Sequence, residues 1–388
     1  MKKGTRLFLL FISLILIVSA VFQIKTNFPD LRMPLINRYV GNVKESANGS
    51  RYKTYFYELA PIERQAYNLI LDEIYDMPEK ILVPNLSEKQ LDEVFKSLLN
   101  DNPDLIFLGR KCRLNSELWN TYISFDYIMS KEEYKKASAD MSLKRDLIIA
   151  SLSDLTDEFK TELEIHDYII ANCVYKLEDE VYSYSSAYGA LVDGKAACEG
   201  YSKAAKYVFD KVGIESILVS GKASGDGRDD GDHMWNIVKI NGDYYHLDLT
   251  WDDPVSSDST SMSIHTYFNL TDEAIGINHS DFSYSPGCTA TEENYSIKHG
   301  LRFENYSDKD DSKLRSLLVN EYNSGEKNIQ ISFVNKSSYD NAFKSLITNK
   351  KIYNVLGNVK SNRGNSVARS ITGYYADDSF YTLTFIFR

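Results

Sequence analysis

Residues 232–254 read DHMWNIVKINGDYYHLDLTWDDP, and this stretch decides the fold of the central part of the chain. Apolar and β-branched residues on both sides of its Asn-Gly pair predict two strands joined by a two-residue turn. With that turn, Ile240 pairs with Asp243, and side chains two residues apart on one strand point to the same side. We therefore expect His233 and Asp248 on one face of the hairpin, close enough for a hydrogen bond from Nδ1–H of the imidazole to the carboxylate.

A cysteine lies upstream, where residues 182–213 (YSYSSAYGALVDGKAACEGYSKAAKYVFDKVG) change from a loop to a helix. Gly189 and Gly194 punctuate the loop, and the helical pattern begins near Ala196. Cys198 is thus expected at a helix N-terminus, where free backbone N–H groups and the positive end of the macrodipole stabilise a thiolate. Taken alone, Cys198 has a second interpretation as a buried, inert cysteine.

Cys198, His233 and Asp248 together supply the parts of a thiol enzyme. A thiol attacks as its thiolate, so it needs a base, and the base needs a carboxylate that fixes its tautomer and orientation. We expect these three residues to form a catalytic triad for acyl transfer, although a strand histidine and aspartate with local hydrogen bonds remain the alternative for His233 and Asp248. The backbone N–H of Cys198 is the expected first oxyanion donor. Tyr188 and Trp235 are candidates for the second donor, but ordinary packing is the better expectation for both.

The two stretches resemble the transglutaminase-like superfamily, particularly its exported bacterial members with an N-terminal extension. The resemblance rests on a G-K-x-x-C-E-G-Y helix start, an H-x-W-N strand and a Y-H-x-D-x-T-W-D-D-P strand in that order, and it covers about residues 155–290. It is continued by Tyr267, Phe268, Asn269, Asp272 and His279. It implies a papain-like α+β fold, with the nucleophile on Cys198, the base on His233 and the orienting carboxylate on Asp248.

Members of that superfamily include transglutaminases, proteases, amidases and inactive relatives. The resemblance therefore implies cysteine-dependent acyl transfer on peptide or isopeptide amides, and it leaves open whether water or an amine receives the acyl group. A catalytically inactive binding or scaffold module at the cell surface is the alternative function.

Five parts are predicted along the 388 residues. They are a signal peptide or membrane anchor (1–27), a linker (28–51), an N-terminal α+β extension (52–152), the catalytic domain (153–292) and a small α+β accessory domain (293–388). Helical spacing is present at 59–75 and 159–173, and Ser87 to Gln90 forms a capping box. Strands are predicted at 118–128 and 328–334, and two more around Asp377 and Asp378.

The N-terminal part has the charge pattern of an export signal. Lys2, Lys3 and Arg6 precede an uncharged apolar stretch at 7–24, which is near the lower length for spanning a bilayer. Either cleavage after a small residue or retention as an anchor would place the rest of the chain outside the cytoplasm, at the cell membrane or secreted.

The net charge and the cysteine spacing limit the classes of ligand and partner that we expect for this protein. The net charge of −11 argues against nucleic acid, and we expect a protein or peptide substrate, cell-wall peptides included. No cysteine pair has metal-ligand spacing, so we expect no metal and no cofactor. Besides Cys198, the cysteines at 112, 173 and 288 allow at most one disulfide. The acidic stretch 225–232 (GDGRDDGD) is interpreted as a solvated loop beside the site rather than a calcium site.

Overall fold

The computed structural model of the chain describes residues 45–117, 120–177, 182–225, 228–253, 264–282 and 286–387. The predicted export segment lies outside these ranges. Within them, none of the helices has the length and apolar character that crossing a membrane requires. The chain forms two compact units that alternate along the sequence: residues 59–95 and 110–126 belong to the first, and 49–58, 96–109 and everything from 127 onward belong to the second. The predicted domain boundaries remain predictions.

The first unit contains helix α3 (Pro61–Glu73) and most of α4 (Glu88–Asp101), together with a three-stranded sheet. The sheet has the order β1-β3-β2, formed by β1 (Ile81–Val83), β2 (Leu108–Glu117) and β3 (Asn120–Tyr127). The predicted capping box is confirmed, because the backbone N–H of Gln90 donates to Ser87 Oγ at 3.3 Å and that of Ser87 donates back to Gln90 Oε1 at 3.1 Å.

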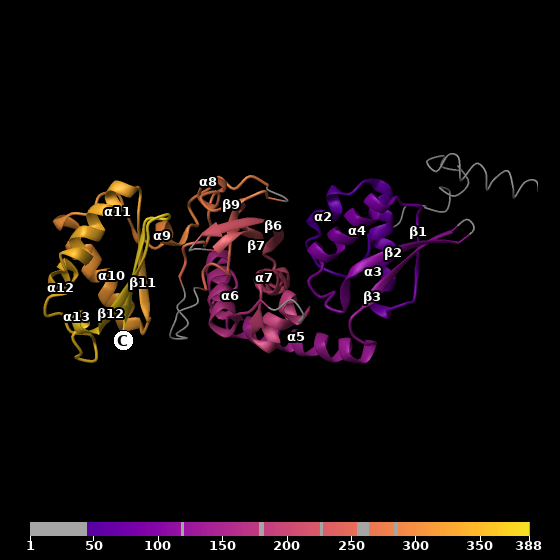
Figure 1. Ribbon diagram of the computed structural model, residues 1–388. Coiled ribbons are helices and arrows are strands. Elements are labelled where there is room, and N and C mark those ends of the chain that lie inside the picture. Colours follow the sequence, from indigo (N-terminus) through magenta and orange to yellow (C-terminus); the bar gives the residue numbers. More distant parts are fainter. Residues whose placement is uncertain are drawn as a thin grey trace, which may run out of the picture. The chain divides into compact units, whose positions relative to one another are not determined.

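The second unit has a four-stranded antiparallel sheet of order β8-β7-β6-β9 at its centre. Its strands are β6 (Glu215–Gly225), β7 (Arg228–Ile240), β8 (Asp243–Leu247) and β9 (His279–Ser280). Helix α7 (Cys198–Val212) packs against β6 and β7, and α6 (Glu158–Asn172) lies beside it (Figure 1). Helix α5 (Lys131–Ser151) precedes α6 in the chain. This mixed helix and strand architecture confirms the α+β fold class.

The hairpin between β7 and β8 has the predicted register. Asn241 and Gly242 have φ values of 52° and 99°, the left-handed pair that a type I′ turn requires. Ile240 pairs with Asp243, and the ladder continues to the pair of Asn236 with Leu247. One loop prediction is wrong: Arg228 to Asp232 belong to β7 and pair with β6, because the hairpin of β6 and β7 extends well beyond the apolar core.

The second unit also contains a smaller α+β domain with its own hydrophobic core. Its sheet has the order β10-β11-β13-β12, and its strands are β10 (Arg302–Phe303), β11 (Asn328–Phe333), β12 (Ile371–Asp377) and β13 (Thr382–Phe387). Its helices are α10 (Asp311–Ser324), α11 (Lys336–Phe343), α12 (Lys351–Leu356) and α13 (Val367–Ser370). Short elements complete the unit: α2 (Thr54–Glu58), β4 (Val174–Tyr175), β5 (Lys195–Ala196), α8 (Asp272–Ile275) and α9 (Tyr295–Lys298).

A buried lysine joins an early segment of the chain to α7. The Lys206 side chain is 1% exposed, and its ammonium group donates to Tyr52 O at 3.1 Å, Ser216 O at 2.8 Å and Asp210 Oδ1 at 3.3 Å. These three acceptors match the three donors of an ammonium group, which is the condition under which a lysine can be buried. Residues 49–58 are thus part of the structure that supports α7.

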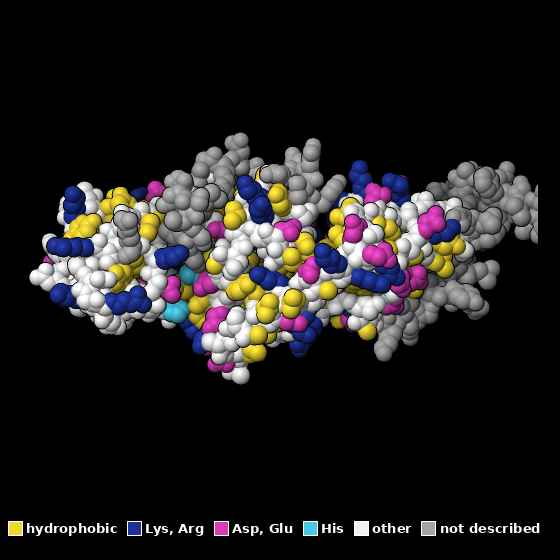
Figure 2. Space-filling view, turned by 90° about the horizontal axis from the view of Figure 1, so that it is seen from below, with side chains coloured by type: hydrophobic (Ala, Val, Ile, Leu, Met, Phe, Trp, Pro, Cys, Tyr) yellow, Lys and Arg dark blue, Asp and Glu magenta, His cyan; other side chains and the backbone are white. Residues whose placement is uncertain are grey.

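On the face seen in Figure 2, basic and acidic side chains are interspersed over the surface rather than gathered by sign.

Candidate active site

Cys198 is the first residue of α7, as predicted, and is partly exposed. The preceding residue, Ala197, has extended backbone geometry, and its N–H donates to Tyr184 O at 2.8 Å. The loop lies so close to the helix that a Cβ at Gly200 would come within 2.5 Å of Tyr184 O and 2.7 Å of Ala196 Cβ. Glycine at position 200 thus permits the loop to bring Cys198 to the helix N-terminus.

His233 and Asp248 meet through a short hydrogen bond. His233 lies on β7, Asp248 follows the end of β8, and their side chains are 8% and 0% exposed. His233 Nε2 donates to Asp248 Oδ2 at 2.6 Å, so the expected contact exists but uses Nε2 rather than the predicted Nδ1. The difference arises because the facing of two strand residues does not fix the rotation of the imidazole ring.

Cys198 is among the groups that raise the pKa of His233, so its thiol lies near the imidazole. Since Nε2 is engaged with Asp248, Nδ1 is the ring atom left for the sulfur. The imidazole is therefore bonded to the carboxylate and near the thiol, which are the partners that an activated nucleophile needs. The structure brings all three predicted residues together, and their catalytic role remains a proposal.

Electrostatics favour a charged imidazole at this position. Burial alone would lower the pKa of His233, but the charge of Asp248, its hydrogen bond and Cys198 outweigh burial and raise that pKa to about 10. Burial would likewise raise the pKa of Asp248, yet His233 and His279 hold it well below its usual range. An imidazolium is the partner that stabilises a thiolate.

Asp248 has further partners that fix the carboxylate. Its Oδ1 accepts from the backbone N–H of Thr250 at 2.9 Å and, at 3.3 Å, from that of Trp251. Its Oδ2 accepts a second imidazole, because His279 Nε2 donates to it at 3.0 Å. In the sequence, only the family resemblance points to His279, because this residue lies on a two-residue strand that no periodic pattern predicts.

The domain that carries these residues matches a known family. The description of the transglutaminase-like superfamily (Transglut_core) fits residues 148–249, an interval that contains Cys198, His233 and Asp248. Residues 148–249 form a transglutaminase-like domain.

Similar solved structures cover only part of the chain. A transglutaminase crystal structure ("a TGase") shares 15% identity over 40% of this chain and 50% of its own, with a TM-score of 0.27. A proposed cysteine protease from Cytophaga hutchinsonii shares 10% identity over 36% and 61% of the two chains, with a TM-score of 0.24. A proposed protease from Parabacteroides distasonis shares 14% over 41% and 34%, with a TM-score of 0.23. The chain thus spans from about a third to about three fifths of these proteins, and no curated protein matches it.

Aromatic rings surround the histidines of the transglutaminase-like domain. Trp251 lies with its ring centroid 6.1 Å from that of His233, and Trp235 stacks on His233 at 5.9 Å. The Nε1–H of Trp235 donates to His246 Nδ1 at 2.9 Å, and His246 Nε2 donates to Asp272 Oδ1 at 2.8 Å. Trp235 is fully buried, which confirms the packing expectation and leaves its N–H unavailable to an oxyanion. The candidacy of Tyr188 as second donor remains a prediction.

A second buried network supports the segment after Asp248. His166 Nδ1 donates to Asp167 Oδ1 at 2.9 Å and Nε2 donates to Asp252 Oδ2 at 3.2 Å, while His265 Nε2 donates to Asp167 Oδ1 at 2.8 Å. Burial would lower the pKa of His166, but the two carboxylates raise it to about 9. Asp252 thus holds a buried histidine. The partner was not predictable because it lies 86 positions earlier.

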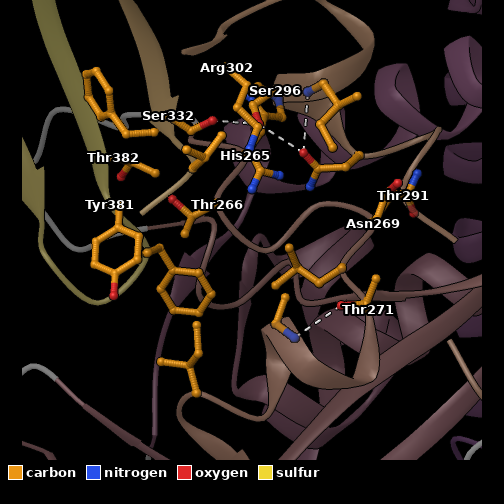
Figure 3. Close-up of a pocket in the computed structure, with 18 of the residues that line it drawn as sticks. His265, Thr266, Asn269, Thr271, Thr291, Ser296, Arg302, Ser332, Tyr381 and Thr382 are labelled. Carbon is orange, nitrogen blue, oxygen red and sulfur yellow. Dashed lines mark hydrogen bonds between the residues drawn. The ribbon is translucent and has the colours of Figure 1, made fainter. Parts of the chain in front are cut away.

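A cavity of about 400 Å³ lies where residues 265–297 meet the C-terminal strands (Figure 3). Much of its polar lining is paired within the protein: Gln330 Nε2 donates to Thr266 Oγ1 at 2.7 Å, and the hydroxyl of Ser332 donates to that of Ser296 at 2.8 Å. Its lining residues, all of them described, include no cysteine. The cavity therefore has polar character but contributes no thiol.

All four cysteines are free thiols. Burial raises the pKa of Cys112 to about 11 and of Cys173 to about 12, and it raises that of Cys288 further. Three clusters, centred on Asp248, Asp167 and Asp272, have donor atoms close enough to hold a cation. In the first two, imidazole N–H groups already donate to the carboxylates, so the donor sets fit hydrogen bonding better than metal binding.

Proposed function

We propose that the transglutaminase-like domain transfers acyl groups from peptide or isopeptide amides through a thioester on Cys198. The observation that carries this proposal is the position of the His233 imidazole, which is hydrogen-bonded to the Asp248 carboxylate and lies near Cys198, the first residue of α7. In this proposal Cys198 is the nucleophile, His233 the acid and base, and Asp248 the carboxylate that orients and charges the imidazole.

The reaction would proceed in two halves. The Cys198 thiolate attacks the amide carbonyl carbon, and the new C–S bond pushes the carbonyl electrons onto oxygen, where the backbone N–H of Cys198 can donate to them. Collapse of this intermediate breaks the C–N bond, and the His233 imidazolium gives its proton to the leaving nitrogen. Water or an amine then attacks the thioester, His233 takes its proton, and Cys198 departs as the thiolate.

The location and partners form part of the same proposal. The basic residues and apolar stretch at 7–24 support placement outside the membrane, either anchored or secreted. Proteins and peptides accessible there, cell-wall peptides included, would be the substrates. A catalytically inactive scaffold is the competing function, and it predicts no special reactivity at Cys198.

Alkylation of the native protein separates these two functions. If the proposal is right, iodoacetamide should label Cys198 faster than the other cysteines below pH 7, because a neighbouring imidazolium favours the reactive thiolate. The other three cysteines serve as internal controls, since burial raises their pKa values, and mass spectrometry assigns each site. An alkylation rate at Cys198 that rises only around pH 8.5, as for an unperturbed thiol, would contradict the enzyme function.

A second experiment identifies the acyl acceptor. The protein is incubated with a labelled primary amine and a glutamine-containing protein, and both label incorporation and peptide cleavage are followed. Incorporation that disappears in Cys198→Ala indicates transfer to amines, whereas cleavage that disappears in the same variant indicates transfer to water. If neither product depends on Cys198, these amides are not its substrates.

A further inference from the structure

Asp248 Oδ2 is shared by two imidazole rings that belong to different strands. His233 on β7 donates to it at 2.6 Å, and His279 on β9 donates to it at 3.0 Å. The chemistry of the proposed triad accounts for the first bond only. The second bond occupies the remaining acceptor position of the same buried oxygen, so its purpose needs a separate explanation.

The His279 ring is fixed from its other side as well. Its Nδ1 lies 2.7 Å from Asn278 Oδ1, and Asn278 Nδ2 donates to the Tyr267 hydroxyl at 2.7 Å. The backbone carbonyl of Asn278 accepts from Ser224 N–H at 2.9 Å. Both ring nitrogens thus have oxygen partners, and the chain segment that carries them is tied to β6.

The fold makes room for this arrangement. His279 is 2% exposed, and its ring centroid lies 4.9 Å from that of Trp235 and 5.2 Å from that of Trp251. At Gly221 a Cβ would lie 2.5 Å from Ser280 O and 2.7 Å from the Trp235 ring. Only a residue without a side chain at this position lets β9 approach β6 closely enough to present His279 to the carboxylate.

We propose that His279 is a positioning residue of the acyl-transfer site, which acts on His233 by holding the Asp248 carboxylate. The inference rests on the proposed function of Cys198, His233 and Asp248. Two backbone N–H groups fix Oδ1 of the carboxylate and His279 fixes Oδ2, so that one lone pair of Oδ2 is directed at His233. Without the His279 donor, a buried acceptor position would be unfilled and the ionised carboxylate less favoured.

The titratable groups that face Asp248 and His279 come from several elements. His233 and His279 face the Asp248 carboxylate, the Tyr267 phenol lies near it, and His246 on β8 lies near His279. A change at His279 should reach the thiol through Asp248 and His233. The acid side of the alkylation profile of Cys198 is therefore the informative measurement.

Two substitutions at position 279 separate the donor from the bulk of the side chain. Glutamine places its amide near the position of Nε2 and keeps a donor to Asp248, whereas asparagine reaches only the position of Nδ1. On the acid limb of the profile, the alkylation rate of Cys198 falls as the pH is lowered. For His279→Asn we expect this fall to occur about one pH unit higher than in the wild type, with a roughly tenfold slower rate at pH 6. His279→Gln should recover most of that loss, and His299→Asn, on α9's C-terminal side, is the matched control.

A second readout does not depend on the thiol. The short bond from His233 to Asp248 should give a downfield imidazole N–H resonance in proton NMR, and His279→Asn should shift or broaden it. If this variant does not fold, Asn278→Ala replaces it, because that change removes the oxygen partner of Nδ1 and should move the acid limb in the same direction by a smaller amount.

The outcomes are distinguishable. Wild-type Cys198 that reacts like an ordinary thiol refutes the proposed function, whatever happens at position 279. If wild-type Cys198 is activated and the acid limb and the resonance are unchanged in His279→Asn, this inference is wrong. An equal loss in His279→Gln and His279→Asn would also refute it, because donation to Asp248 would then not be the property that matters.

Discussion

Replacing Asp248 by asparagine is the sharpest single perturbation of the proposed site. The amide has the same shape, and its oxygen can still accept from the backbone N–H groups of Thr250 and Trp251. Its NH2 group would then stand where Oδ2 accepts from two imidazole rings. His233 would have to present a bare Nε2 and carry its proton on Nδ1, facing the sulfur with the wrong tautomer.

The structure indicates how large the effect should be. The pKa of His233 is about 10 instead of the usual 6.5, so its surroundings favour the imidazolium by about 5 kcal/mol, at about 1.4 kcal/mol per pH unit. Asp248 is the main favourable contribution, and burial opposes it. Removing the carboxylate charge should leave His233 neutral at pH 6.5 and slow alkylation of Cys198 on the order of 100-fold or more.

The assay compares alkylation rates between pH 5 and 9 in the wild type, Asp248→Asn and a matched control. Asp272→Asn makes the same chemical change at the carboxylate that accepts from His246, next to Cys288 rather than Cys198, so only alkylation at Cys198 is compared. We expect a normal profile for that control. Thermal unfolding of both variants shows whether each is folded.

One result would refute the reasoning. If folded Asp248→Asn protein alkylates at pH 6.5 within about threefold of the wild-type rate, the carboxylate does not charge His233, and the ion pair of imidazolium and thiolate is not the source of reactivity. An equal loss in the Asp272→Asn control would point instead to a general disturbance of the sheet.

Two further predictions concern stability. Gly221→Ala should lower the free energy of unfolding by about 1–3 kcal/mol, because the added Cβ meets Ser280 O, whereas Gly373→Ala, with a nearest contact of 3.7 Å, should change it by less than about 1 kcal/mol in urea unfolding. The pKa of His166 is raised to about 9, so its stabilisation is complete below pH 6.5 and is lost as the pH rises through 9. Urea unfolding at pH 6.5 and 9.5 should therefore show a loss of stability that is smaller by up to about 3 kcal/mol in His166→Gln than in the wild type, and equal losses in both proteins would contradict the assignment.

The hairpin was predictable because a two-residue turn allows only one pairing register between the two strands. Once Asn241 and Gly242 occupy the turn, the facing of every side chain up to His233 follows from the alternation along the strands. The helix position of Cys198 followed from equally local signals. Local chain geometry was therefore enough to place each of the three proposed residues on its element, whereas their approach to one another depends on the packing of α7 against β7.

The remaining contacts depend on pairings between distant segments. His279 reaches the site because β9 pairs with β6, where His279 is the partner of Ala223. A strand of two residues is too short to show a pattern from which this pairing could be predicted. Asp252 finds His166 on a helix far upstream, and the choice of Nε2 over Nδ1 depends on ring rotation within the packed core. Such features follow from tertiary packing, and they cannot be predicted from hydrophobic periodicity or secondary-structure propensity.

Lys206 also determines how this domain can be excised. Two of its acceptors lie in or next to α7, and the third is the backbone carbonyl of Tyr52, almost a hundred residues before the interval that matches the family. A fragment cut to residues 148–249 would keep Cys198, His233 and Asp248, but it would lose His279 and leave the Lys206 ammonium group inside the protein with an unmet donor. We therefore expect that any shortened version or fusion of the transglutaminase-like domain has to retain residues 49–58, either in the chain or supplied as a separate peptide.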